Sequence, residues 1–144
     1  MYAKQLMKGD YVSFVDKETK EVRVARVEDY FEREYCTELC TVSWTAKGTI
    51  LKTCIRIEIE QLKPIVLVRD ILVKNGFKKV GDYFVITECP LADNEGVGRL
   101  IWTNGHIETL VHFNRCEVVV CECKYVHQLQ HALRLFGVRK EVVL

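Results

Sequence analysis

The sequence predicts a mainly β, α+β protein in which a small SH3-like β-barrel packs on an antiparallel β-meander flanked by two helices. The first 63 residues alternate apolar and polar side chains with the period of two that is typical of half-buried strands. At Pro64 the period changes to that of a short helix, and strand-like alternation returns after Gly76. Asn104-Gly105 lies between two further strand patterns and is typical of a two-residue hairpin turn.

The N-terminal part has the pattern of short strands joined by polar turns. In its second strand the alternation slips by one residue between Val24 and Val27, which is typical of a β-bulge that curls a sheet. Because closure removes the exposed edges of a sheet, this pattern favours a small closed barrel of the SH3-like kind. The predicted strands cover residues 9–15, 21–30, 40–45 and 55–60.

The C-terminal part has the pattern of a helix, a β-meander and a second helix. Apolar residues from Leu67 to Leu72 have helical spacing, and Asn75-Gly76 followed by Phe77 is typical of the Schellman motif that ends a helix. The last helix is predicted over residues 125–136, where one stripe recurs at helical spacing. The stripe consists of Val126, Leu129, Leu133 and Phe136. The meander strands cover residues 77–80, 83–87, 99–103, 106–113 and 116–123.

The change of pattern at Pro64 predicts two modules, a barrel over residues 1–63 and an α-β-meander-α unit over residues 64–144. Each is near the lower size limit of an independent domain, so the two are expected to pack on each other. The chain has 21 Lys and Arg against 20 Asp and Glu, with 11 basic and 11 acidic residues before Pro64. Neither module therefore has the positive excess typical of a nucleic-acid-binding domain.

The sequence shows no signal-peptide pattern and no run of about 18 apolar residues that could cross a membrane. Its seven cysteines are odd in number, and most stand where a strand needs a small apolar side chain. Buried, reduced thiols explain this distribution better than a disulfide framework does. The sequence thus predicts a soluble, cytoplasmic protein with no membrane contact and no cofactor.

Three segments of the sequence together resemble a known family. The most specific of the three segments is Lys124-Tyr125-Val126-His127-Gln128-Leu129-Gln130. The second segment runs from Leu62-Lys63-Pro64-Ile65-Val66-Leu67 to Asn75-Gly76-Phe77. The third is a short stretch from Leu6 through Gly9-Asp10-Tyr11-Val12. These segments resemble a family of small uncharacterised proteins encoded by Bacteroidetes bacteria, often near phage-derived or mobile genes. The resemblance implies no activity, because none is established for that family.

The chain departs from the family pattern at two positions. Val68 stands where the family usually has Thr, so the first helix lacks a side-chain N-cap, a loss of about 1 kcal/mol. Asp70 in the first turn partly offsets this loss through the helix dipole. His131 stands where the family commonly has Asn, so any chemistry of a histidine pair is particular to this chain.

The sharpest candidate for chemistry is Cys121-Glu122-Cys123 followed by His127 and His131. Two thiols and two imidazoles can form a tetrahedral zinc site, and His at positions i and i+4 can chelate from one helix face. However, Cys-x-Cys is tighter than the usual zinc spacing, and strand alternation already explains both cysteines. The histidines are also predicted to face away from the packed sheet. Surface or interface histidines are therefore the preferred interpretation, and no metal is predicted.

Aromatic side chains of the barrel are a second candidate, because small SH3-like barrels bind peptides or nucleic acids through aromatic loop residues. An equally weighted alternative is that these rings fill the seam between the modules. The aromatic residues in question are Tyr11, Phe14, Tyr30, Phe31 and Tyr35.

The face of the last helix opposite the apolar stripe carries His127, His131 and Arg134 together with Leu135. An apolar Leu135 is unusual on a solvated face. We therefore expect this face to be covered by the N-terminal module or by a second copy of the protein.

The sequence favours a non-enzymatic accessory or protein-interaction protein of phage or mobile-element origin, with an unidentified protein partner and a homodimer as an option. Neutral charge, the lack of catalytic motifs and the family resemblance support this hypothesis. One alternative is nucleic-acid binding through the N-terminal barrel, and a second is a metal protein or enzyme using the Cys/His cluster at 121–131. The weak candidates for binding are His127, His131, Arg134, Tyr11 and Tyr30.

Overall fold

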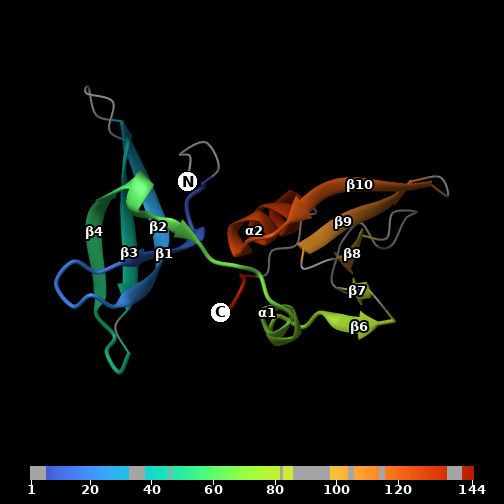
Figure 1. The fold of residues 1–144 in the computed structure, drawn as a ribbon, viewed down its shortest axis with the longest axis horizontal. Helices are drawn as coiled ribbons and strands as arrows, with labels where there is room; N and C mark the ends of the chain where they lie inside the picture. The colour runs from blue at the N-terminus through green and yellow to red at the C-terminus, as the bar shows by residue number, and fades with distance from the viewer. Residues whose placement is uncertain are drawn as a thin grey trace. The chain divides into compact units, whose positions relative to one another are not determined.

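The computed structural model describes residues 6–32, 38–45, 47–81, 83–85, 98–103, 106–113, 116–135 and 141–144. The chain divides into two compact units, Met1–Ile65 and Val66–Leu144. Each unit contains one five-stranded antiparallel sheet, and the second also contains both α-helices (Figure 1). The protein is thus mainly β and of the α+β class, as predicted.

The sheet of the first unit has the strand order β4-β3-β2-β1-β5. Its two edge strands, β4 and β5, do not pair with each other among the residues described, so the sheet is open and the predicted closed barrel is not confirmed. The last strand is short and ends in Pro64, which has no N–H to donate to a ladder. The elements are β1 (Tyr11–Val15), β2 (Val22–Glu32), β3 (Glu38–Thr45), β4 (Lys52–Glu58), the 3-10 helix η2 (Ile59–Gln61) and β5 (Lys63–Pro64).

The bulge in β2 lies further along the strand than predicted. Pairing of β1 with β2 runs unbroken from Tyr11↔Arg26 to Val15↔Val22, whereas the β2–β3 register shifts between Val27 and Asp29. The predicted slip at Val24 is wrong because Val24 faces outward and is 46% exposed. Val24 is therefore an apolar residue on the exposed side of β2, and the alternation of inward and outward side chains does not slip there.

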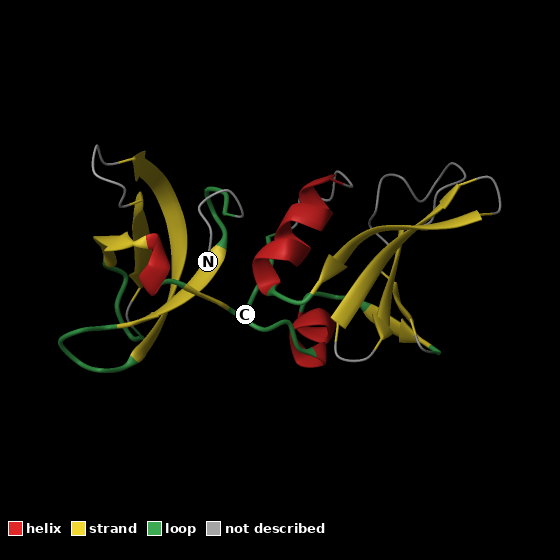
Figure 2. Cartoon of the chain, turned by 45° about the horizontal axis from the view of Figure 1, so that its top comes forward, coloured by secondary structure: helices red, strands yellow, loops and turns green. Residues whose placement is uncertain are grey.

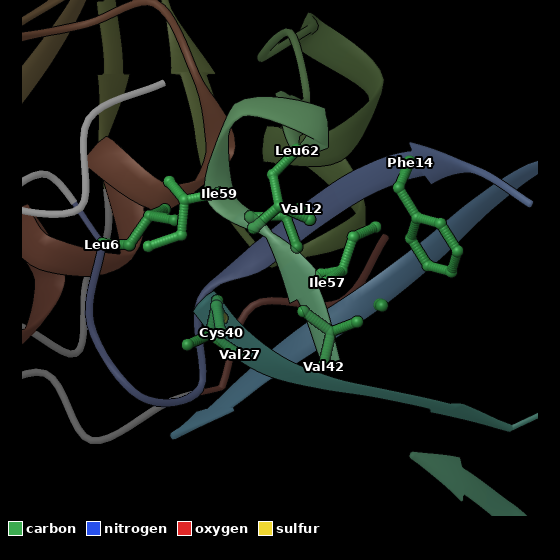
Figure 3. Close-up of a cluster of buried hydrophobic side chains, with 10 residues drawn as sticks. Leu6, Val12, Phe14, Val27, Cys40, Val42, Ile57, Ile59 and Leu62 are labelled. Atoms are coloured by element: carbon green, nitrogen blue, oxygen red, sulfur yellow. The ribbon is translucent and has the colours of Figure 1, made fainter. Parts of the chain in front are cut away.

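A cluster of buried side chains forms the core of this unit (Figure 3). Alternation along β3 places Cys40 and Val42 in the core with no exposed surface, as predicted. Ile59, predicted to continue the preceding strand, lies instead in η2 and is buried there. The cluster consists of Leu6, Val12, Phe14, Ala25, Val27, Cys40, Val42, Ile57, Ile59 and Leu62.

The sheet of the second unit is the predicted meander, because its order β10-β9-β8-β7-β6 pairs each strand with the next in sequence. Two residues separate each of the terminal partners Val80↔Tyr83, Thr103↔His106 and Phe113↔Cys116. This register agrees with the two-residue hairpin predicted at Asn104-Gly105. The strands are β6 (Lys78–Val80), β7 (Tyr83–Val85), β8 (Gly98–Thr103), β9 (His106–Phe113) and β10 (Cys116–Cys123).

Helix α1 (Arg69–Lys74) ends in the predicted Schellman motif. The Phe77 amide donates to the Leu72 carbonyl at 3.1 Å, and the Gly76 amide donates to the Val73 carbonyl at 3.0 Å. Gly76 takes the positive φ of 81° that this motif needs. Phe77 and Leu72 are both buried, as predicted. The helix begins after Val68, which provides no side-chain cap.

Helix α2 (Val126–Leu135) begins with a side-chain cap from within the Tyr-Val-His-Gln segment. Gln128 Oε1 accepts hydrogen bonds from the Lys124 amide at 2.8 Å and the Tyr125 amide at 3.1 Å. A Gln at the third helical position thus satisfies amides before the helix. The residues of the predicted stripe that are described, Val126, Leu129 and Leu133, are buried, and Phe136 lies outside the described part.

Both helices lie at the same end of the meander (Figure 2). Val66 forms a bridge with Tyr125, and the Leu67 amide donates to the Lys124 carbonyl at 3.0 Å, so the segments that lead into the two helices lie side by side. Neither helix, nor any other in the described part of the chain, is long and apolar enough to span a membrane.

Asn75, the residue after α1, fastens the C-terminal residues to the helix. Its amide nitrogen donates to the carbonyls of Ile71 and Val143 at 2.7 Å each, and its Oδ1 accepts from the Val143 amide at 2.7 Å. The Asn75 side chain is 2% exposed. Lys74 adds a hydrogen bond to the Leu144 carbonyl.

Candidate functional site

The first unit contains a groove of about 560 Å³ on the side of the sheet where the core lies. The β1–β2 turn, β3, β4 and η2 all contribute to it, and every lining residue belongs to this one unit. The lining residues are Phe14, Val15, Asp16, Lys17, Glu18, Leu39, Trp44, Thr53, Ile55, Arg56, Ile57, Glu58 and Gln61.

The floor of the groove is apolar and partly open to solvent. Phe14 is buried and meets the Trp44 ring edge-on, with 5.5 Å between ring centroids. Trp44 and Ile55 pack against the core cluster but are only partly buried, and Leu39 is also half-buried. Trp44 takes this place because it continues the inward alternation of Cys40 and Val42 at the end of β3. The groove can therefore receive an apolar side chain.

The rim of the groove is charged and ordered by the β1–β2 turn. Asp16 accepts hydrogen bonds from the amides of Glu18 at 2.9 Å and Thr19 at 3.4 Å, and its other oxygen lies 3.4 Å from Arg23 Nε. The pKa of the Asp16 carboxyl is lowered, chiefly by the hydrogen bond from the Glu18 amide. At the far side Gln61 donates to the Glu58 carboxylate at 2.9 Å. Asp16 is therefore charged at neutral pH and holds the turn in shape.

A second, smaller hollow of about 380 Å³ includes Tyr11 and a polar cluster around Glu28. Arg26 lies over the Tyr11 ring at 4.7 Å from its centroid. Glu28 accepts from Ser43 Oγ at 2.5 Å and lies 2.6 Å from Lys52 Nζ. These two hydrogen bonds, Lys52 first, lower the pKa of the Glu28 carboxyl. Because its charges are already matched within the sheet, this hollow offers little to a charged ligand.

The structure separates the aromatic candidates of the first unit. Phe14 lies under the groove, whereas Tyr11 pairs with Arg26 in the second hollow, so the two do not form one surface. The side chains of Tyr30 and Phe31, and all of Tyr35, lie outside the described part. Neither the predicted aromatic binding set nor the predicted seam is tested as a whole.

The histidine candidates of α2 differ in exposure. His127 is 3% exposed, so of its two predicted interpretations the surface one is wrong and the interface one stays a prediction. His131 is half-buried and Arg134 is exposed. The His127 ring stacks on Tyr125 with 5.8 Å between centroids and meets His131 edge-on at 5.9 Å. Burial of α2 thus extends beyond its apolar stripe, to Gln130 for example, and covering of this face by the N-terminal module or by a second copy stays a prediction. The prediction for Leu135 falls on a side chain outside the described part.

The possible zinc ligands are only partly placed. Cys123 has no exposed surface and is not in a disulfide, and the side chain of Cys121 is not among those described. Within the described ranges, no three His, Cys, Asp or Glu residues are grouped so that they could hold a metal ion. The described residues therefore supply no metal centre from which a reaction could be derived.

Sequence reasoning missed the groove residues Trp44, Ile55 and Leu39. All three fit the strand pattern, so nothing in the pattern separates them from ordinary core residues. The signal that could have found them is position, because Trp44 stands at the end of its strand next to Lys47-Gly48, where a large ring is hard to cover.

Comparison of the chain with protein-family models, with curated proteins and with solved structures finds no match.

Proposed function

We propose that this chain is a non-catalytic binding protein whose first unit holds an extended segment of a partner protein in the groove above Phe14 and Trp44. The observation that carries the proposal is the half-buried Trp44 next to Ile55 in a groove of about 560 Å³. Large rings in well-packed pockets are the usual anchors of protein interfaces. An extended segment fits an open groove bounded by strands and a turn.

The charges of the rim favour a peptide over a nucleic acid. Asp16, Glu18 and Glu58 supply three carboxylates, against the two cations of Lys17 and Arg56. Arg23 beside Asp16 balances the third carboxylate, so the rim has no positive excess with which to neutralise phosphates, on which nucleic-acid affinity rests. We therefore expect the partner segment to combine an apolar anchor with at least one basic residue.

We further propose that the first unit is an SH3-like domain and that the protein works in the cytoplasm, as an accessory of a phage or mobile element. The strand order β4-β3-β2-β1-β5, the bulged long β2 and η2 between β4 and β5 support the fold assignment. The described cysteines Cys40, Cys54 and Cys123 are not in disulfides, which supports a reducing compartment. Gene neighbourhood is the test of the proposed origin.

Selection of linear peptides from a random display library on the immobilised full chain tests the binding proposal. Enriched peptides should carry an aromatic or aliphatic anchor and a basic residue. Trp44→Ala should weaken their binding about tenfold or more. Because Trp44→Ala removes a ring that packs on the core, its folding must be checked by circular dichroism and denaturation.

Two glutamates near the β1–β2 turn provide a test variant and a matched control that both leave the core intact. Glu18 lines the groove and Glu21, three residues away, does not. Glu18→Lys should therefore weaken the selected basic peptides, whereas the matched Glu21→Lys should not. The proposal is wrong if no peptide is enriched or if both variants bind equally. Retention on heparin or single-stranded DNA at low salt, weakened by salt, would instead support nucleic-acid binding.

A further inference from the structure

The two edges of the first sheet differ in how they are protected from pairing. One edge is β5, which has two residues and ends in Pro64. The other edge is β4, which has seven residues, no Pro and an unbroken register with β3 from Leu39↔Glu58 to Thr45↔Lys52. Its residues are exposed except Ile55, which is half-buried, and Ile57, which is buried. A long, regular edge strand is a template for another strand.

We propose that a second copy of this chain adds its own β4 to this edge, antiparallel and about a two-fold axis at Ile55. The proposal goes beyond the binding function above and does not depend on it. It would join two five-stranded sheets edge to edge. The order of charged residues along β4 is the reason for proposing a second copy of the chain as the partner.

The sequence of β4 is complementary to itself when it is reversed about Ile55. In this register Lys52 of one copy lies opposite Glu58 of the other, and the same pair recurs at the other end of the strand. Lys52 also pairs with Glu28 of its own sheet at 2.6 Å, so Glu58→Lys, which leaves that pair intact, is the cleaner of the two charge variants. The two Ile55 side chains face each other at the centre, each packed against its own core cluster. Opposite charges and β-branched side chains are both favourable as directly opposed pairs.

The neighbouring registers that keep each side chain on its own face are unfavourable. Shifting the axis to Cys54 places Lys52 opposite Arg56, and shifting it to Arg56 places the two Arg56 side chains opposite each other. Like charges directly opposite one another destabilise a strand pair. The pattern of charges thus disfavours both registers next to the proposed one, and a two-fold axis at Ile57, which would pair Arg56 with Glu58, leaves only three residues of each β4 opposite the other.

Two exposed apolar residues extend the same surface. Ile50 is 98% exposed and Leu51 is 74% exposed, immediately before Lys52. Ile59, which would come opposite Leu51, is already buried in η2, so the gain comes from Leu51 where it adjoins the paired strand. The pairing would therefore also remove apolar surface from water beyond the strand itself.

Charge reversal tests the register. Lys52→Glu and Glu58→Lys each place like charges opposite each other at two positions, so each should raise the dimer dissociation constant about tenfold or more. The double variant Lys52→Glu/Glu58→Lys restores two opposite pairs and should regain dimerisation. An equimolar mixture of the two single variants should do the same, as heterodimers. Sedimentation equilibrium of the full chain over a concentration series, without any peptide, measures each case.

A cysteine placed across the two-fold axis gives an independent readout. In the proposed register Arg56→Cys puts the new thiol opposite the exposed Cys54 of the second copy, within the Cα distance that a disulfide spans. Oxidation should then give covalent dimers, and Cys54→Ser/Arg56→Cys should not. A wild-type chain that stays monomeric at all concentrations, charge variants that all behave like wild type, or equal cross-linking in both cysteine variants would overturn the proposal. Glu58 and Arg56 also line the groove, so Glu58→Lys and Arg56→Cys change the peptide site as well. The two proposals stay distinguishable because dimerisation is measured without peptide and peptide binding is tested by Glu18→Lys, which lies outside β4.

Discussion

Asn75 is expected to be the most sensitive polar position of the second unit. Its buried side chain makes three hydrogen bonds of 2.7 Å, two of them to the backbone of Val143. Asn75→Ala removes all three. At about 1 kcal/mol net for each hydrogen bond the loss would be about 3 kcal/mol, and since Val143 is half-exposed and can be solvated again, we expect about 2–3 kcal/mol.

Urea denaturation of the full chain measures this loss, with the transition of the second unit followed separately where the two units unfold apart. The helix end itself does not require Asn, because Asn75 has a negative φ of −91°. The loss should therefore come from the C-terminal contact. Removing residues 141–144 should lower the stability too, and Asn75→Ala should then cost much less in the shortened chain than in the full one.

Two further variants separate the hydrogen bonds from the burial. Asn75→Asp keeps an acceptor for the Val143 amide but aims an oxygen at the carbonyls of Ile71 and Val143. Burial should raise the pKa of such a carboxyl, so the penalty should be largest at neutral pH and shrink as the pH falls and the group becomes a donor. Lys74→Ala, which removes an exposed contact to Leu144, is the matched control and should change stability little. The reasoning is refuted if Asn75→Ala is as stable as Lys74→Ala.

Three other outcomes follow from single positions. Gly76→Ala should destabilise the second unit by about 1 kcal/mol in denaturation, because a φ of 81° is unfavourable for a residue with a Cβ. Glu28 has a lowered folded-state pKa, so its contribution to stability is fully present above its ordinary pKa of 4.5. The stability difference between wild type and Glu28→Gln should shrink as the pH falls from that value and vanish once the pH has passed the lowered folded-state pKa. Cys54 should react with a maleimide in the native protein. Cys40, whose pKa burial raises to about 11, should react only on unfolding, as peptide mapping would show.

Patterns that depend on a few neighbouring residues predicted this fold well. Asn75-Gly76-Phe77 specified the end of α1, and Asn104-Gly105 specified a hairpin whose flanking residues Thr103 and His106 do pair. In both cases the backbone conformation is set by the residues themselves, chiefly by the freedom of glycine. Such local signals do not depend on the tertiary contacts of the segment.

Features that depend on distant contacts were predicted less well. Apolar periodicity showed that Val24 belongs to a strand but could not show that its face is exposed, so the bulge was expected too early. The half-burial of Trp44 depends on how far β4 and the β1–β2 turn reach over it, which no local pattern encodes. For α2 the apolar Leu135 predicts that the face with His127 is covered, but a helical wheel cannot show what covers it.

The segment Tyr125–Gln130 carried the most specific sequence signal, and the structure accounts for most of it by folding. Val126 and Leu129 are buried, and Gln128 caps the two amides before the helix. His127 is buried against the Tyr125 ring, as a core aromatic would be. A motif that folding explains gives no separate evidence for a ligand. Trp44 is the opposite case, because a large ring left half-open beside charged side chains is not explained by stability alone. For this reason we propose the binding function for the first unit.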